Sequence, residues 1–367
     1  MAMIDSAICE VAFREAVLAC DPAARVREAL EREPVRGRDV IGLAIGKAAL
    51  AMARGAGAVA RGLVVTNVDD KRGLPTGWTL QLASHPIVDM SSIDAGIEAI
   101  LLVESARRYD VVLALISGGA SALVEQPIDG VSFDEYRNSI QALMASGAPI
   151  QELNALRTRL SAIKGGKLAA RCAAPIVTLV VSDVIGDDPR VIGSGPTVGD
   201  PLRDGDRVEV VGPMASFGEA ITDALQARGI EARRLAEPIA DDVAIVADQL
   251  AAEQGVVVAW GEPTVRVPET HGSGGRAQQL ALELARRFRG TTRCGFVAGS
   301  DGLDGSSPRG AAGAYVDGST WDEIVAQKLD PALALRSCDA GTVLDAVGAL
   351  FVTGPTGINH ADVVIVG

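Results

Sequence analysis

The chain has 367 residues, a length that favours two domains over one. Apolar residues make up 48% of the chain and charged residues 22%, as in ordinary globular enzymes, and the aromatic fraction of 3% leaves Ala, Val, Leu and Ile to build the cores. The net charge of −13 argues against nucleic-acid or anionic-membrane partners, because both require clustered Lys and Arg.

The sequence also predicts where the protein works. Its longest apolar stretches are too short to span a bilayer, and the N-terminus lacks the basic and apolar regions of an export signal. Five scattered cysteines without C-x-x-C spacing suit buried thiols in the cytoplasm, and three histidines argue against a multi-histidine metal site. The oligomeric state stays open, with a homo-oligomer as one alternative.

The first part of the chain alternates short apolar runs with Ala-rich stretches. The runs at 40–45, 62–66, 110–116 and 176–181 predict buried parallel strands. The stretches 48–60 and 91–107 predict helices between them. This alternation predicts an α/β domain with a Rossmann-like parallel sheet, helices on both faces and ligands beyond the carboxyl ends of the strands.

The second part predicts a smaller α/β domain. A charged loop at 199–208 precedes a helix, a strand pair, a further helix and two strands. These elements are expected at 216–228, 256–260 with 264–267, 275–288, 295–299 and 349–352. We expect the domain boundary near residues 235–240, which gives domains of 1–237 and 238–367.

The turn after the first strand resembles a nucleotide-binding P-loop but departs from it. Only three residues separate Gly42 from Gly46, and Ala48 replaces the hydroxyl residue that would follow Lys47 and hold Mg²⁺. The pattern alone therefore leaves the role of Lys47 open.

The turn after the strand at 110–116 contains Ser117, Gly118, Gly119 and Ser121. Adjacent glycines let backbone N–H groups point at a ligand, and the serines add hydroxyl donors, so this turn predicts a carboxylate or phosphate site. The alternative is a tight turn that needs glycine for steric reasons alone.

A second polar segment extends over residues 152–167. If it is one helix, Asn154, Arg157 and Ser161 share a face that Lys164 continues. That face suits an anionic ligand, and the alternative is an ordinary solvated helix.

A cluster of carboxylates follows the strand at 176–181. Asp183, Asp187 and Asp188 lie at the predicted carboxyl end of this strand, and Gly193, Ser194 and Gly195 follow them. Carboxylates in this position favour a Mg²⁺ site or a general base, and the alternative is a set of surface Asx turns.

The second half repeats loops of this kind. Residues 272–278 open a predicted helix, so backbone donors and Arg276 could meet an anion at its positive end. Two further Gly-rich loops contain Asp301 and Asp304, and Thr353, Gly354 and Asn359. Each alone would be interpreted as an ordinary polar turn, but together they predict a cleft lined by anion-binding turns. Residues 272–277 also match G-x-G-x-x-A, but no acidic residue closes the next strand, so a dinucleotide site is discounted.

These loops, taken in order, resemble the type-2 glycerate kinase family, whose C-terminal half is called the MOFRL domain and whose members are often labelled hydroxypyruvate reductase. The resemblance covers most of the chain in eight ordered blocks. They are GKAALAMA at 46–53, SHPIVD at 84–89, SGGASALV at 117–124, ELNALRTRLSAIKGGKLA at 152–169, VSDVIGDDPRVIGSGPTVGDP at 181–201, GGRAQQLAL at 274–282, GSDGLDG at 299–305 and TGPTGIN at 353–359.

The resemblance implies ATP- and Mg²⁺-dependent phosphorylation of D-glycerate to 2-phosphoglycerate in a cleft between two α/β domains. It implies catalytic roles for Lys47, Asp187 and Arg276. The spacing suggests Asp183 as the metal ligand, because it lies just past the strand end, whereas Asp187 follows Gly186 on a turn that reaches further. Whether Asp183 or Asp187 lies nearer the reacting hydroxyl stays open. The substrate-binding candidates are Ser117, Gly118, Gly119, Ser121, Asn154, Arg157 and Lys164. The nucleotide-binding candidates are Gly193, Ser194, Gly195, Asp301, Asp304, Thr353, Gly354 and Asn359.

The sequence departs from the family pattern at several positions. Ala120 replaces a glycine, Ala277 and Gln279 replace the Asn and Glu of a GGRNQE signature, and Ile358 interrupts TGTN. These changes bear on the choice of substrate more than on the reaction class. The alternatives are a kinase for another short hydroxy acid, a nicotinamide-dependent hydroxypyruvate reductase and a catalytically weakened relative that only binds a sugar acid. The position of the phosphate on the product stays open.

Overall fold

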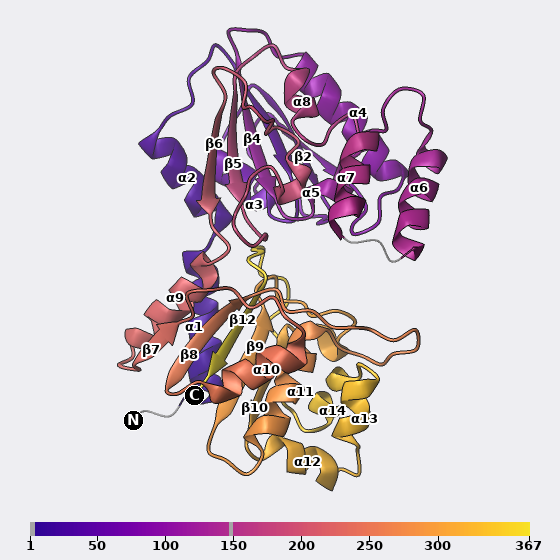
Figure 1. The fold of residues 1–367 in the computed structure, drawn as a ribbon. Coiled ribbons are helices and arrows are strands. Elements are labelled where there is room, and N and C mark those ends of the chain that lie inside the picture. The colour runs from indigo at the N-terminus through magenta and orange to yellow at the C-terminus, as the bar shows by residue number, and fades with distance from the viewer. Residues whose placement is uncertain (1–3, 147–149) are drawn as a thin grey trace. The chain divides into compact units, whose positions relative to one another are not determined.

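The structure is a computed structural model that describes residues 4–146 and 150–367. It divides into two compact units (Figure 1). The N unit is Asp21–Pro213, and the C unit combines the described residues up to Cys20 with Met214–Gly367. None of the helices in the described residues has both the length and the apolar composition needed to cross a membrane.

The N unit is built on a sheet of six parallel strands in the order β3-β2-β1-β4-β5-β6. The strands are β1 (Val40–Ile45), β2 (Arg61–Thr66), β3 (Trp78–Leu82), β4 (Val111–Ser117), β5 (Ile176–Val181) and β6 (Arg207–Gly212). The order reverses between β1 and β4, and such a reversal opens a ligand site at the carboxyl ends of the two strands. The predicted Rossmann-like parallel sheet is confirmed.

Helices α2 (Pro22–Arg32) and α3 (Ala49–Ala56) cover one face of this sheet, and α4 (Met90–Glu104), α5 (Ala120–Leu123) and α8 (Lys167–Ala170) cover the other. The N unit also contains α6 (Phe133–Ala145) and α7 (Ile150–Leu160). Side chains of β1 alternate between two cores, because successive residues of a strand point to opposite faces. Ile41 and Leu43 pack with α4, whereas Ala44 packs with α2 and α3.

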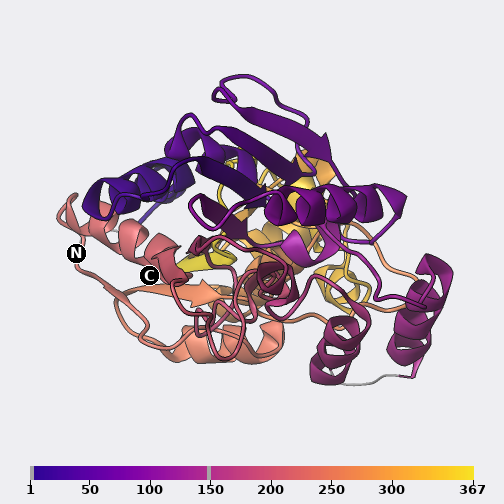
Figure 2. The ribbon, with the colours of Figure 1, turned by 90° about the horizontal axis from the view of Figure 1, so that it is seen from above.

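Helices α6 and α7 lie beside one another, away from the sheet (Figures 1 and 2). They share a small apolar cluster that includes Tyr136, Ile140 and Leu153, and Val88 from the segment before α4 packs against it. Packing therefore helps to place this helical pair on the rest of the N unit.

The C unit contains a mixed sheet of six strands in the order β11-β10-β9-β12-β8-β7. The strands are β7 (Ala232–Arg234), β8 (Val256–Gly261), β9 (Cys294–Gly299), β10 (Gly313–Asp317), β11 (Leu350–Phe351) and β12 (Asp362–Val366). Only β7 and β8 among these pair in parallel. Because β12 lies antiparallel between β8 and β9, its first residue is beside the carboxyl ends of both neighbours.

The helices of the C unit are α1 (Ser6–Ala19), α9 (Ser216–Gln226), α10 (Val243–Ala252), α11 (Arg276–Phe288), α12 (Thr320–Ala326), α13 (Pro331–Arg336) and α14 (Ala340–Ala346). Helix α11 is buried along most of its length. Helix α1 comes from the start of the chain and packs with α9 in one core (Figure 1). Its Phe13 ring lies 5.2 Å from Phe217 and 5.0 Å from Phe351, centroid to centroid.

Three features differ from the sequence predictions. The chain passes from one unit to the other after Cys20 and again after Pro213, whereas we expected a single boundary between residues 237 and 238. The physical reason is that the apolar face of α1 packs in the core of the C unit, against residues such as Phe217. Residues 264–267 form no strand, since β7 and β12 already occupy both edges of β8. The segment 199–208, predicted as a loop, contains the start of β6 at Arg207.

Candidate active site

The point where the sheet order of the N unit reverses is formed by the turns after β1 and β4. The backbone N–H of Lys47 donates to the carbonyl of Gly118 at 2.9 Å, and that of Ala48 donates to Oγ of Ser117 at 3.1 Å. Gly46 has a φ of +132°, and a Cβ there would lie 2.1 Å from Oγ of Ser117. Only glycine therefore allows the two turns to approach this closely. Lys47 is held half-buried beside the predicted anion-binding turn.

His85 joins this turn, although no role was predicted for it. A Cβ built on Gly119 would lie 3.1 Å from Cδ2 and Nε2 of His85 and 3.4 Å from Cγ of Lys47. The imidazole and the lysine stem thus both pack against Gly119, whose φ is +84°. His85 follows β3 within the block SHPIVD, and its place in that block was the only signal in the sequence.

The loop Gly193–Gly195 lies against the same turn. A Cβ on Gly193 would be 2.7 Å from Cβ of Ala120. The carbonyls of Ser194 and Gly195 accept hydrogen bonds from the N–H groups of Gly165 and Gly166, at 2.8 and 2.7 Å. The structure therefore brings the predicted nucleotide-binding loop next to the predicted substrate-binding turn within the N unit.

The predicted polar helix face is only partly formed. Helix α7 ends at Leu160, so Ser161 and Lys164 lie beyond it and do not extend the face of Asn154 and Arg157. Asn154 is exposed and Arg157 is half-buried, whereas Lys164 is buried in an ion pair with Glu125. The local reason is that the chain pairs with residues 126–128 directly after Leu160, where the N–H of Ala162 donates to the carbonyl of Gln126 at 2.7 Å. Sequence reasoning gave no role to Glu125.

The carboxylates after β5 separate into two groups. Asp188 forms an ion pair with Arg190, with 2.7 Å between Oδ2 and Nη2, and hydrogen bonds from that guanidinium lower the pKa of Asp188. Asp183 and Asp187 are half-buried, and Asp187 has a φ of +52°. Within residues 4–146 and 150–367, no three His, Cys, Asp or Glu side chains are grouped to hold a metal ion.

In the C unit, Arg276 is the first residue of α11 and lies between two carboxylates. Its Nε is 2.5 Å from Oδ2 of Asp362, and its Nη1 pairs with Glu262. Burial opposes the charge on Arg276, but the two carboxylates outweigh it and raise its pKa. Burial raises the pKa of Asp362 to about 7, against the opposing effect of Arg276. The guanidinium is thus fixed at a helix start.

The start of α11 differs from the prediction that its backbone donors meet a ligand. Asp304 accepts hydrogen bonds from the N–H groups of Ala277 and Gln278 at 3.1 and 2.8 Å. Its side chain is buried, and that burial raises its pKa against the effect of these hydrogen bonds. Asp304 therefore already occupies the positive end of the helix.

The two remaining predicted loops of the C unit bind each other. The N–H of Thr356 donates to the carbonyl of Asp301 at 3.1 Å, and a Cβ on Gly302 would lie 2.0 Å from the carbonyl oxygen of Gly354. Asn359 is buried, whereas Asp301 is half-buried. Thr353 and Gly354 are half-buried on the same pair of loops, beside the end of β9 and the start of β12. The structure brings these four candidates together.

Comparison with known proteins places the chain among its relatives. Residues 8–227 match the "Domain of unknown function (DUF4147)" and residues 255–362 match the "MOFRL family". The D-glycerate 2-kinase of Thermotoga maritima is 34% identical in an alignment that covers 89% of this chain and 90% of that protein. A relative from Agrobacterium vitis, 34% identical over 96% of this chain and 92% of its own length, is named provisionally as a hydroxypyruvate reductase.

A solved structure shares the fold. The crystal structure of a glycerate kinase from Thermotoga maritima superposes with a TM-score of 0.88 and 29% identity and covers 98% of each chain. The α/β architecture and the resemblance noted in the sequence are confirmed by these matches. With a DUF4147 region followed by a MOFRL region, the chain belongs to the glycerate 2-kinase family.

Proposed function

We propose that this protein is a glycerate 2-kinase, which transfers the γ-phosphoryl group of ATP to the 2-hydroxyl of D-glycerate. The observation that carries the proposal is the joined turn at the sheet reversal, where Lys47 lies against the Ser117–Gly119 loop. Relatives named glycerate 2-kinase, similar over nearly the whole chain, support the same reaction. Phosphoryl transfer relies on positioning and charge neutralisation, which fixed turns and cations supply.

The proposed catalytic roles follow from chemistry. Lys47 and Arg276 would neutralise charge on the transferring phosphoryl group, each contributing about 3 kcal/mol as preorganised transition-state donors typically do. Asp187 would orient or deprotonate the substrate hydroxyl. For Arg276, the pairs with Asp362 and Glu262 hold the guanidinium in one orientation before any ligand arrives.

The proposed binding roles divide the remaining candidates. The backbone and hydroxyls of Ser117, Gly118, Gly119 and Ser121, with Asn154 and Arg157, would hold the glycerate carboxylate. The loop Gly193–Gly195, and Asp301, Thr353, Gly354 and Asn359, would contact the nucleotide. Asp304 would support the loop of Asp301 indirectly, because its carboxylate accepts hydrogen bonds from the start of α11.

Magnesium is a proposed cofactor. Mg²⁺ favours one or two carboxylates completed by phosphate and water. Asp183 and Asp187 offer this oxygen donor set at the end of β5, and both are half-buried, so the residues present fit the ion. Bound there, Mg²⁺ would neutralise phosphate charge, while Asp183 would hold it.

The hydroxypyruvate reductase alternative is less well supported by the site. Its one sequence signal is the G-x-G-x-x-A match at residues 272–277, which requires a pyrophosphate at the start of α11. The carboxylate of Asp304 already accepts the N–H groups there, and it would repel a pyrophosphate. We also propose a cytoplasmic location, in line with five scattered cysteines, four of them buried. A homo-oligomer stays one alternative for the oligomeric state, which size-exclusion chromatography would measure.

A substrate panel tests the proposal. Initial rates of ADP release with ATP and Mg²⁺ are measured for D-glycerate, L-glycerate and other short hydroxy acids, beside NADH oxidation with hydroxypyruvate. We expect D-glycerate to be the best acceptor and NADH to be left unchanged. Faster turnover of another hydroxy acid would reassign the substrate, NADH oxidation would favour the reductase, and ATP binding without turnover would identify a weakened relative.

A further inference from the structure

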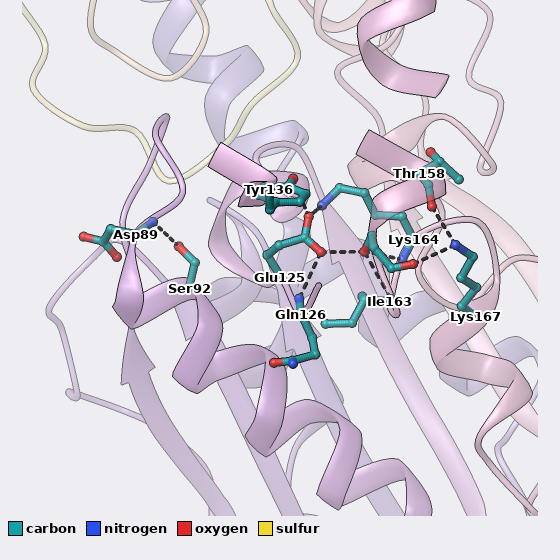
Figure 3. Close-up of polar contacts among 10 residues, drawn as sticks. Asp89, Ser92, Glu125, Gln126, Tyr136, Thr158, Ile163, Lys164 and Lys167 are labelled. Atoms are coloured by element: carbon teal, nitrogen blue, oxygen red, sulfur yellow. Dashed lines mark hydrogen bonds and ion pairs between the residues drawn. The ribbon is translucent and has the colours of Figure 1, made fainter. Parts of the chain in front are cut away.

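Glu125 has a fully buried carboxylate that takes hydrogen bonds from four directions. The Tyr136 hydroxyl donates to Oε2 at 2.7 Å, the Ser161 hydroxyl donates to Oε1 at 2.5 Å, and the Gln126 N–H donates to Oε1 at 2.9 Å. The ammonium group of Lys164 pairs with Oε2. The Glu125 and Lys164 side chains are 0% and 1% exposed, so solvent cannot replace either partner. Figure 3 shows the carboxylate between Tyr136 and Lys164.

This carboxylate joins segments that are far apart in the sequence. Tyr136 belongs to α6, and Ser161 follows α7 directly. The backbone adds a short clamp, in which the N–H of Ala162 donates to the carbonyl of Gln126 at 2.7 Å. Glu125 itself is anchored to α4, because its N–H donates to the carbonyl of Ser92 at 3.0 Å. The helical pair α6 and α7 is thereby tied to the sheet domain at a buried point, in addition to the hydrogen bonds from Nζ of Lys167 to the carbonyls of Thr158 and Ser161 at 2.6 and 2.7 Å.

The turn that follows Lys164 is hydrogen-bonded to the proposed nucleotide-binding loop, Gly193–Gly195. The two residues after Lys164, Gly165 and Gly166, donate their N–H groups to the carbonyls of Ser194 and Gly195. A Cβ on Gly166 would lie 2.5 Å from Cα of Gly199, so the two backbones are in direct contact. Displacement of Lys164 would therefore move the loop Gly193–Gly195 with it.

A buried ion pair is a poor means of gaining stability, because desolvation offsets most of the attraction between the charges. Here burial lowers the pKa of Lys164, while Glu125 opposes that effect. Buried pairs that persist despite this cost can serve to fix one arrangement of the chain. The four donors on Glu125 leave little freedom for a second arrangement.

We propose that Glu125 and Lys164 are positioning residues that set the loop Gly193–Gly195 in its nucleotide-binding position. This inference rests on the proposed function, because it assigns that loop to the nucleotide. It replaces the expected contact between Lys164 and the substrate by an action through the 164–166 turn. Neither residue touches a reacting atom in this account.

The test compares single and double variants. Lys164→Met leaves the Glu125 charge buried without its cation, so we expect both a lower midpoint of urea unfolding and a higher KM for ATP. In the double variant Glu125→Gln/Lys164→Met no charge is left uncompensated, so the unfolding midpoint should recover. The KM for ATP should stay raised by at least about tenfold, with the KM for D-glycerate within about twofold of the parent.

Tyr136→Phe is the matched control, because it removes one donor from the same carboxylate oxygen without touching the turn. It should lower the unfolding midpoint and leave the KM for ATP unchanged. Recovery of a parental KM for ATP in the double variant, together with its stability, would show a purely structural pair and overturn the inference.

Calorimetric titration with Mg–ATP separates this inference from the proposed function. The Kd for ATP should be at least about tenfold weaker in the double variant than in the parent, whatever the acceptor substrate proves to be. Equal Kd values in the two proteins would refute the positioning role even if the parent phosphorylates glycerate. A parent that binds ATP but phosphorylates no hydroxy acid would refute the function alone.

Discussion

Replacing Gly119 by Ala adds one methyl group where the turn after β4 meets Lys47 and His85. The new Cβ would lie 3.1 Å from two ring atoms of His85 and 3.4 Å from Cγ of Lys47. Ordinary contacts between carbon atoms fall at about 3.5–4.0 Å, so the imidazole of His85 must withdraw by a few tenths of an ångström, whereas the stem of Lys47 stays near ordinary van der Waals contact. The φ of +84° at Gly119 adds about 1–2 kcal/mol of backbone strain for any residue with a Cβ.

Two magnitudes follow from these contacts. The strain should lower the free energy of unfolding by about 1–2 kcal/mol. Misplacing a group of the site by 1 Å can cost about a hundredfold in rate, so a shift of a few tenths of an ångström at His85 and the turn should lower kcat/KM by about fivefold. The free energy of unfolding and kcat/KM are measured separately, so a loss of activity through displaced side chains can be distinguished from a loss through unfolding.

Gly130→Ala provides the matched control. Gly130 has a φ of +83°, and a Cβ there would meet no atom within 4 Å. It should lose about the same 1–2 kcal/mol from backbone strain and keep parental kcat/KM. The assays are urea unfolding and initial rates with ATP and D-glycerate. Equal stability losses with parental activity in both variants would refute the placement of Lys47 and His85 at a working site.

Three further predictions concern single charges. Lys47→Ala should lower kcat/KM by at least about a hundredfold with the urea midpoint unchanged, and a fully active variant would make Lys47 a solvated residue. Asp187→Asn should lower turnover at an unchanged Mg²⁺ requirement, and Asp183→Asn should raise the Mg²⁺ concentration for half-activity. Parental Mg²⁺ titrations for both would make this loop structural. The native pKa of Asp362, raised to about 7, lies above its unfolded value, so the native state holds the extra proton. This contribution to stability is complete below about pH 4 and is lost as pH rises through about 7, at up to about 1.4 kcal/mol per pH unit. Urea titrations of Asp362→Asn should lack that slope, and an unchanged slope would contradict the shift.

Local patterns were sufficient to predict much of the N unit. The apolar runs of β1, β2, β4 and β5 are each continuous in sequence, and their burial on both faces follows from helices in between. The glycine turn at Ser117–Gly119 was also predicted, at the end of the strand that is β4. Its contact with Lys47 was not predicted, because that contact depends on the pairing of β1 with β4.

Long-range partners could not be predicted in this way. Glu125 and Lys164 are 39 residues apart, and neither lies in a pattern that signals a buried charge. Helix α1 has an ordinary amphipathic sequence, which does not reveal that its partner is α9. Asp304 resembled a ligand-binding loop residue until the backbone of α11 proved to be its partner. In each case the sequence shows one partner of an interaction, and only the tertiary fold shows which residue is the other.

The central claim is that this chain phosphorylates D-glycerate at its 2-hydroxyl. Phosphorus NMR of a reaction with ATP, Mg²⁺ and D-glycerate tests it most directly, because 2-phosphoglycerate and 3-phosphoglycerate give different signals. We expect the γ-phosphate signal of ATP to be replaced by that of 2-phosphoglycerate, at a rate that Lys47→Ala abolishes. Release of inorganic phosphate alone, or a product phosphorylated at another position, would contradict the account.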